Sequence, residues 1–169
     1  ITPRNITPAV TLSETSFVYN GKVQKPSVSV KDGEHTLSSE NYTISFDREP
    51  VNRGTYKATI ELKKNYTGSA TASFTIIAKS IAPTVALSKT SYTYNGKIKK
   101  PSVTVKDGTS ILDGSNYTVT YASGLKNVGM YKIEVKMKGN YSGSATKSFR
   151  IDAKNVTPQV ILSTTTYTY

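Results

Sequence analysis

Apolar and polar residues alternate with a period of two along several stretches of this 169-residue chain. In the clearest stretch, residues 130–138, apolar side chains alternate with charged ones: Tyr131, Ile133, Val135 and Met137 against Lys132, Glu134, Lys136 and Lys138. Successive side chains of a strand face opposite ways, so this pattern predicts a strand with one buried face and one wet face. No stretch shows a convincing period of 3.6, and we therefore expect an all-β protein.

The chain repeats itself at a fixed offset of 75 residues, which brings Asn20-Gly21 onto Asn95-Gly96. Val-Lys-Asp-Gly at 30–33 likewise returns at 105–108, without any insertion or deletion between the copies. Self-similarity at a fixed period indicates a repeat array. The predicted organisation is the end of a preceding unit or a linker, two complete units, and the first strand or strands of a third, truncated repeat: residues 1–5, 6–80, 81–155 and 156–169.

Each unit is expected to contain short strands separated by turn signals. In the second unit the predicted strands are Thr84–Leu87, Ser91–Tyr94, Lys100–Val105, Tyr117–Tyr121, Met130–Lys138 and Ser144–Ile151. Such spacing favours two tandem small β-sandwich (Ig-like) modules of about 75 residues each. A β-grasp-like or open-barrel unit is the alternative architecture, although no crossover helix is visible.

Two kinds of glycine-containing turn recur between the strands. Asn20-Gly21 and Asn95-Gly96 each stand between β-prone runs. We interpret both as structural turns of type I′ hairpins, which need a positive φ at both central residues. Asp32 and Asp107 each precede a glycine, and a hairpin turn explains that pattern without a metal ligand.

The join between the two units, residues 76–83, contains no glycine and no Ser/Gly run. Flexible linkers are rich in those residues, so the join predicts modules held in a limited range of angles, as a semi-rigid head-to-tail rod. A further hypothesis is that the segment leading up to each Tyr-Asn-Gly packs on the preceding module. We therefore expect each module to interact with the neighbouring modules of the same chain.

The sequence argues against catalysis. His35 is the only histidine, and Ser110 stands at its position in the second unit. A Ser/His/Asp site therefore cannot exist in that unit, and the carboxylates do not recur as an acid/base pair. The acidic residues are also too scattered for calcium. We expect no enzyme, no catalytic or metal site and no cofactor.

Positive charge is the one compositional signal for a ligand. The chain carries a net charge of +11, and the second unit has twelve basic against four acidic residues where the first has nine against seven. The candidate polyanion-binding residues are Lys97, Lys99, Lys100 and Lys106. They could meet an anionic cell-wall polymer or a host glycan. The competing interpretation is a solvated face that keeps the rod soluble. Lysine lacks the fork that favours phosphates, and no nucleic acid partner is expected.

The tyrosines could in principle form a sugar-stacking platform. However, three pairs recur in strict register at the 75-residue offset: Tyr42/Tyr117, Tyr56/Tyr131 and Tyr66/Tyr141. Recurrence at strand-internal positions favours core or inter-sheet corner residues. No apolar run approaches the roughly 18 residues that a membrane helix needs, so no membrane insertion is expected.

Four motifs of the second unit carry a family resemblance. They are Leu-Ser-Lys-Thr-Ser-Tyr-Thr-Tyr-Asn-Gly-Lys-Ile-Lys-Lys-Pro-Ser-Val-Thr-Val at 87–105, Asn-Tyr-Thr-Val-Thr-Tyr at 116–121, Asn-Val-Gly-Met-Tyr at 127–131, and Gly-Asn-Tyr-Ser-Gly-Ser at 139–144. The chain resembles bacterial Ig-like and MBG/YDG-type tandem repeats of large surface proteins from Gram-positive, Clostridia-type bacteria. The resemblance implies an extracellular parent, attached to the cell surface or cell wall. In such a parent the modules serve as a structural stalk that displays other domains. An adhesive or cell-wall-binding module with a Lys-rich face is the alternative.

Overall fold

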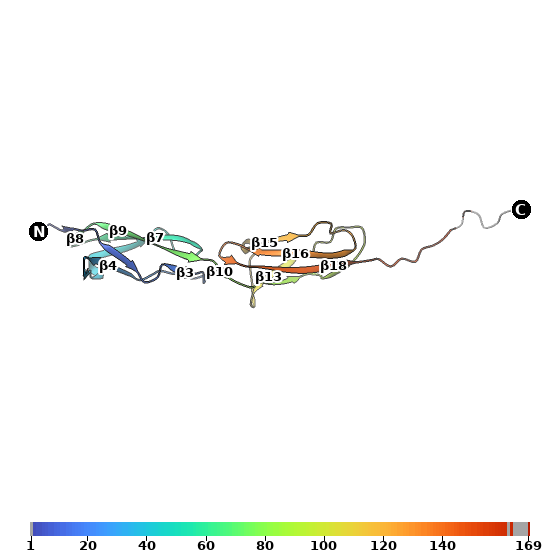
Figure 1. Ribbon diagram of the computed structural model, residues 1–169, viewed down its shortest axis with the longest axis horizontal. Helices are drawn as coiled ribbons and strands as arrows, with labels where there is room; N and C mark the ends of the chain where they lie inside the picture. The colour runs from blue at the N-terminus through green and yellow to red at the C-terminus, as the bar shows by residue number, and fades with distance from the viewer. Residues whose placement is uncertain (1, 162, 164–168) are drawn as a thin grey trace.

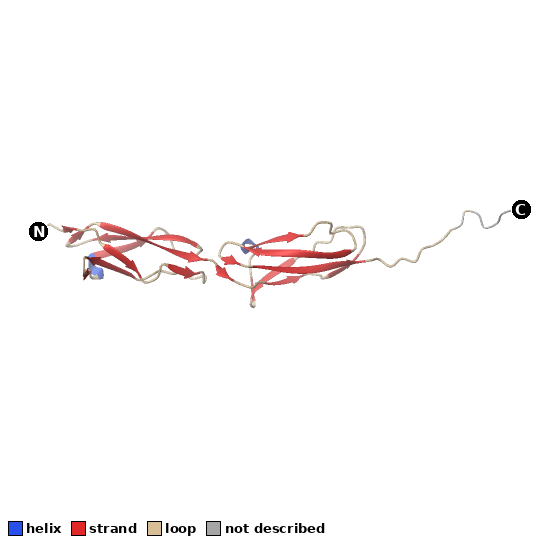
Figure 2. Ribbon diagram, in the orientation of Figure 1, coloured by secondary structure: helices blue, strands red, loops and turns tan. Residues whose placement is uncertain are grey.

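The computed structural model describes residues 2–161, 163 and 169 (Figure 1). Two β-modules lie end to end along the long axis of the molecule, and β-strands dominate both of them (Figure 2). Among the described residues, the only helices are two single 3₁₀ turns, and no helix is long and apolar enough to cross a membrane. The prediction of an all-β chain with two tandem modules is confirmed.

The first module is built from two sheets. Its elements are β1 (Arg4–Asn5), β2 (Ala9–Leu12), β3 (Ser16–Val18), β4 (Val28–Asp32), β5 (His35–Thr36), η1 (Ser39–Asn41), β6 (Tyr42–Phe46), β7 (Gly54–Leu62), β8 (Tyr66–Thr67) and β9 (Ser69–Ile77). The four-stranded sheet has the order β3-β9-β7-β6, and the three-stranded sheet has the order β2-β4-β5. Separately, β1 pairs in parallel with β8.

The second module repeats this topology strand for strand. Its elements are β10 (Lys79–Ser80), β11 (Thr84–Leu87), β12 (Ser91–Thr93), β13 (Val103–Asp107), β14 (Ser110–Ile111), η2 (Gly114–Asn116), β15 (Tyr117–Tyr121), β16 (Gly129–Met137), β17 (Tyr141–Ser142) and β18 (Ser144–Asp152). The sheets have the orders β12-β18-β16-β15 and β11-β13-β14, and β10 pairs in parallel with β17.

The two sheets of each module pack face to face around a small core. In module 2, Val105 on β13 and Val135 on β16 belong to one buried cluster and are both fully shielded from solvent. Phe149 is 1% exposed and stacks on Tyr131, with ring centroids 5.5 Å apart. On β16 the predicted apolar residues are the buried ones and the charged residues between them are exposed, as the period of two requires.

Most of the recurring tyrosines belong to this core. Tyr42 and Tyr56 of module 1 and Tyr131 of module 2 are buried, and Tyr117 is half-buried. The hydroxyl of Tyr131 donates to the carbonyl oxygen of Asn127 at 2.7 Å, which fastens the loop before β16 to the core. The core interpretation is confirmed for these positions.

The prediction of an Asn-Gly hairpin is wrong. β12 pairs in parallel with β18, while the following strand, β13, lies in the other sheet. Of the turn residues, Gly96 has a positive φ of 73° and Asn95 does not, so the type I′ geometry is absent. The Asn95 side chain instead accepts the backbone N–H of Lys97 at 3.1 Å. A sandwich requires the chain to cross between sheets here, and an Asx turn begins that crossing.

The Asp-Gly turns do form hairpins. β4 and β5 pair antiparallel with Asp32 opposite His35, and Asp107 lies opposite Ser110 in the same way. The predicted strand Lys100–Val105 starts three residues later than expected, at Val103, and continues to Asp107. The buried Pro101 has no N–H to offer a ladder, which accounts for the late start.

The segment after module 2 extends away from it (Figure 1). Val156 and Val160 are 72% and 82% exposed. The predicted third repeat falls partly on positions 162 and 164–168, which lie outside the described residues. The hypothesis that the segment leading up to each Tyr-Asn-Gly packs partly on the preceding module stays a prediction; in module 2, Ser91–Thr93 pairs with β18 of its own module.

Candidate functional site

The candidate functional site is the junction between the two modules. β9 of module 1 ends at Ile77, and after Ala78 the chain enters β10 of module 2. β10 pairs in parallel with β17, placing Lys79 opposite Tyr141. The N–H of Lys79 donates to the carbonyl of Asn140 at 2.9 Å. The linker is therefore itself a strand of module 2, and not a free tether.

A glycine permits the close approach of this linker strand. A Cβ on Gly143 would stand 2.2 Å from the carbonyl oxygen of Ile81, and its φ of 123° is already unfavourable for other residues. Gly68 lies at the equivalent position of module 1, where a Cβ would meet the Ile6 carbonyl at 2.1 Å. The recurring Tyr-Thr/Ser-Gly triplet thus has a structural function, which is to let the entering strand pass.

Four side chains fix the modules against each other. The Asn140 side chain accepts the backbone N–H of Arg53 at 2.7 Å and donates to the Asn52 side chain at 2.9 Å. The rings of Tyr19 and Tyr141 meet edge to face, with centroids 5.5 Å apart and an interplanar angle of 78°. Such aromatic pairs contribute about 0.5–1.5 kcal/mol beyond the area they bury. Module 1 therefore contacts the module that follows it, opposite to the direction of our hypothesis.

An ion pair anchors the linker strand from the side of module 2. The Lys79 ammonium hydrogen-bonds the Asp107 carboxylate at the end of β13. That hydrogen bond, assisted by the carboxylate charge, raises the pKa of Lys79 above its usual value of 10.5. Arg4 and Asp32 form the equivalent pair in module 1, at 2.8 Å. The pair is recurrent although the basic residue differs.

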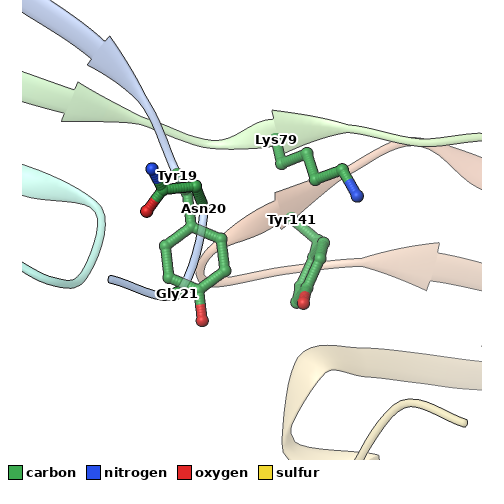
Figure 3. Close-up of a pocket in the computed structure, with 5 residues that line it drawn as sticks. All are labelled: Tyr19, Asn20, Gly21, Lys79 and Tyr141. Atoms are coloured by element: carbon green, nitrogen blue, oxygen red, sulfur yellow. The ribbon is translucent and has the colours of Figure 1, made fainter. Parts of the chain in front are cut away.

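A small cavity of about 250 Å³, open to solvent, also lies at the junction. Figure 3 shows the residues that line it: Tyr19, Asn20, Gly21, Lys79 and Tyr141. The first Asn-Gly turn therefore lies at the junction, while Asn95 and Gly96 stand at the far end of module 2. The lining offers no carboxylate or imidazole base for chemistry. Elsewhere in the described residues, no group of three or more His, Cys, Asp or Glu side chains is arranged to hold a metal ion.

The structure divides the candidate lysines into two places. Lys97, Lys99 and Lys100 lie together beside the Asn95 turn, whereas Lys106 is near the opposite end of β13. Lys99 hydrogen-bonds the Asn95 side chain, and its ammonium lies 5.8 Å from the Tyr92 ring centre. The expected four-lysine cluster is therefore reduced to three, because Lys106 is the fourth of the five residues of β13 and the other three lysines precede that strand.

Tyrosine rings contact lysine ammonium groups in and beside this lysine group. Lys100 lies 4.7 Å from the ring centre of Tyr121, and Lys89 lies 5.3 Å from that of Tyr92. Burial raises the pKa of Tyr121, whose hydroxyl donates to the Pro101 carbonyl at 2.6 Å. These cation–π contacts use the ammonium groups within the module.

The sequence alone does not reveal that Asn52, Asn140 and Tyr141 make contacts between modules. Their counterparts at the 75-residue offset are Asn127, Asn65 and Tyr66, so all three residue types are identical in both copies. Asn140 and Asn65 head Asn-Tyr-Ser/Thr turns that local backbone capping explains equally well. Only the geometry shows that the side chain of Asn140 reaches another module.

The fold and the junction define a tandem array of β-sandwich modules joined end to end. The chain belongs to the MBG domain family, whose model matches residues 8–80 and 83–155. The resemblance to MBG-type modules is thereby confirmed. The family is a non-catalytic repeat family typical of extracellular surface proteins. No curated protein matches the chain.

Proposed function

We propose that these modules are spacer units of an exported surface protein, in which they hold other domains away from a Gram-positive cell wall. The observation that carries the proposal is the incorporation of the linker into β10, paired with β17. A linker that is a strand of the next module transmits orientation, whereas a flexible tether loses it. Membership of the MBG family supports the extracellular location.

The inter-module contacts add to this argument. Asn140 contacts the loop of module 1 that holds Asn52, and Tyr141 contacts Tyr19 in another loop of module 1, so the two modules meet at two places. Each is modest alone, since a net hydrogen bond contributes about 0.5–1.5 kcal/mol. Together with the pairing of β10 and β17, they favour one inter-module angle.

Small-angle X-ray scattering of the full chain tests the spacer function. We expect an elongated particle at least as long as two modules end to end, with the same maximum dimension at low and high salt. A distribution of dimensions that includes folded-back particles would contradict the proposal, because a spacer must keep its ends apart.

An adhesive function is the second candidate, and the grouping of Lys97, Lys99 and Lys100 at one end of module 2 favours it. The test is retention on immobilised teichoic acid or heparin at increasing ionic strength, beside a variant with all three lysines replaced by glutamate. Adhesion through this group predicts salt-sensitive retention that the variant loses. Retention that is equal for both proteins would exclude these lysines as the binding site.

A further inference from the structure

Each module has two end faces: one end carries residues equivalent to the module 1 side of the junction, and the other end carries residues equivalent to the module 2 side. We define the trailing face of module 1 as Tyr19, Asn20, Gly21 and Asn52, and the leading face of module 2 as Lys79, Asn140 and Tyr141. At the offset of 75 residues, the trailing face of module 2 is Tyr94, Asn95, Gly96 and Asn127. The leading face of module 1 is Arg4, Asn65 and Tyr66. The first pair of faces meets at the junction, and the second pair lies at the two ends of the molecule.

The outer faces keep the residues that the junction uses. Every trailing-face residue is identical in the two modules, and the leading faces differ only by Arg4 in place of Lys79. Val128 replaces Arg53, but Arg53 contributes its backbone N–H, which valine also has. The hydrogen bonds and the tyrosine pair between the modules therefore depend on no side chain that the outer faces lack.

The leading face of module 1 is also already shaped for docking. β1 pairs with β8 as β10 pairs with β17, and the Arg4–Asp32 ion pair is formed. The hollow at the leading face of module 1, lined partly by Arg4 and Tyr66, is about 380 Å³. The equivalent cavity of the junction is smaller, at about 250 Å³, and there the Tyr-Asn-Gly turn of the preceding module forms part of the lining.

Two residues of the used faces are less exposed than their counterparts on the free faces. Tyr19 is half-buried against Tyr141, whereas its counterpart Tyr94 is 37% exposed. Asn140 is half-buried, whereas Asn65 is exposed and its side chain makes no hydrogen bond to the described residues. Among the described residues of one module, the hydrogen bonds of these two loops use the backbone carbonyl groups of Asn65 and Asn127 and not their side chains.

We propose that the trailing face of module 2 and the leading face of module 1 each dock a further module of this family along the same polypeptide, through the contacts of the observed junction. The occupant is a covalently continuous module and not a second copy of the chain, because docking requires β18 to lead directly into the entering strand, as β9 leads into β10. This inference deepens the proposed spacer function: the faces give every junction of an array the same angle.

The experiment extends the full chain by one module. Tyr169 corresponds to Tyr94 at the 75-residue offset, so residues 95–155 appended after Tyr169 complete a third module. The chain has no cysteine, and pairs of introduced cysteines carry spin labels without interference. Double electron–electron resonance measures two distances between spin labels. The first distance joins Lys57→Cys and Lys132→Cys, and the second joins Lys132→Cys and a cysteine at the equivalent lysine of the added module.

We expect the two distance distributions to share their mean and width. Asn127→Ala should broaden only the second distribution, and Asn52→Ala only the first. A second distribution that is broad from the start, or unmoved by Asn127→Ala, would overturn the inference. If the first distribution is narrow in that case, the spacer function of the observed junction survives; if both are broad, the spacer function fails as well.

A reciprocal chain tests the leading face independently, should the appended module fail to fold. Residues 6–75 placed before Ile1 complete a preceding module, since Ile1 corresponds to Ile76. In this chain Asn65→Ala should broaden the distance distribution across the new junction. An Asn65→Ala variant with an unchanged distribution across that junction would contradict the docking of this face.

Discussion

Replacing Asn140 with alanine is the sharpest single perturbation of the junction. The side chain makes two hydrogen bonds to module 1, one from the Arg53 backbone N–H at 2.7 Å and one to the Asn52 side chain at 2.9 Å. Within module 2 the residue is used through its backbone carbonyl, which alanine retains. The substitution therefore removes contacts between modules and leaves the folding of module 2 nearly unchanged.

The expected loss follows from those two bonds. A net hydrogen bond contributes about 0.5–1.5 kcal/mol, and both partners left behind are reached by water, which places the loss at about 1–2 kcal/mol. That free energy lowers the ratio of docked to undocked junctions by about 5–30-fold. The loss should appear in the inter-module geometry while the unfolding free energy of module 2 changes little.

The chain supplies its own control in Asn65→Ala. Asn65 occupies the same position of module 1, but it is exposed and its side chain makes no hydrogen bond to the described residues. Spin labels at Lys57→Cys and Lys132→Cys should report a broader distance distribution for Asn140→Ala and an unchanged one for Asn65→Ala. Equal distributions for Asn140→Ala and the parent chain, or equal broadening by both variants, would refute the assignment of Asn140 to the junction.

Three further outcomes are expected. Phe149→Ala should destabilise module 2 by about 3–5 kcal/mol in denaturant unfolding, because this buried ring fills the core. Gly143→Ala should expose the amide of Ile81 to hydrogen exchange, since a Cβ there collides with the linker strand. The backbone N–H of Lys57 lowers the pKa of Asp47 below 3.8, so this carboxylate stabilises the fold above that pH and the contribution fades as pH falls through the folded value. Asp47→Asn should therefore flatten the acid end of the stability curve, measured as unfolding free energy against pH.

Much of the fold could be predicted from the sequence because one physical signal repeats without interruption. The alternation on residues 130–138 identifies a half-buried strand, and the 75-residue offset shows the same strand in the first module. The direction in which a strand pairs, and the sheet to which it belongs, do not follow from the residues of that strand alone. Tyr-Asn-Gly carries the chemistry of a hairpin turn, yet the strand before it pairs in parallel with the last strand of its module. That pairing depends on contacts with residues about 60 positions away, which no turn motif records.

The candidate site was harder to predict. Lysines counted along the chain suggested one group, but strand geometry separates Lys106 from Lys97. Conversely, Asn52 and Asn140 are 88 positions apart and look like ordinary loop residues. Their meeting depends on how one module is set on the next, and two-residue strands such as β10 and β17 are too short to leave a periodic signal.

The central claim is that the junction fixes one orientation between the modules. Residual dipolar couplings of the full chain, measured for backbone amides in both modules, test it directly. If the orientation is fixed, a single alignment tensor fits the couplings of residues 8–80 and 83–155 together, in the relative orientation of Figure 1. Two tensors of clearly different magnitude would show that the modules reorient independently, and would contradict the claim.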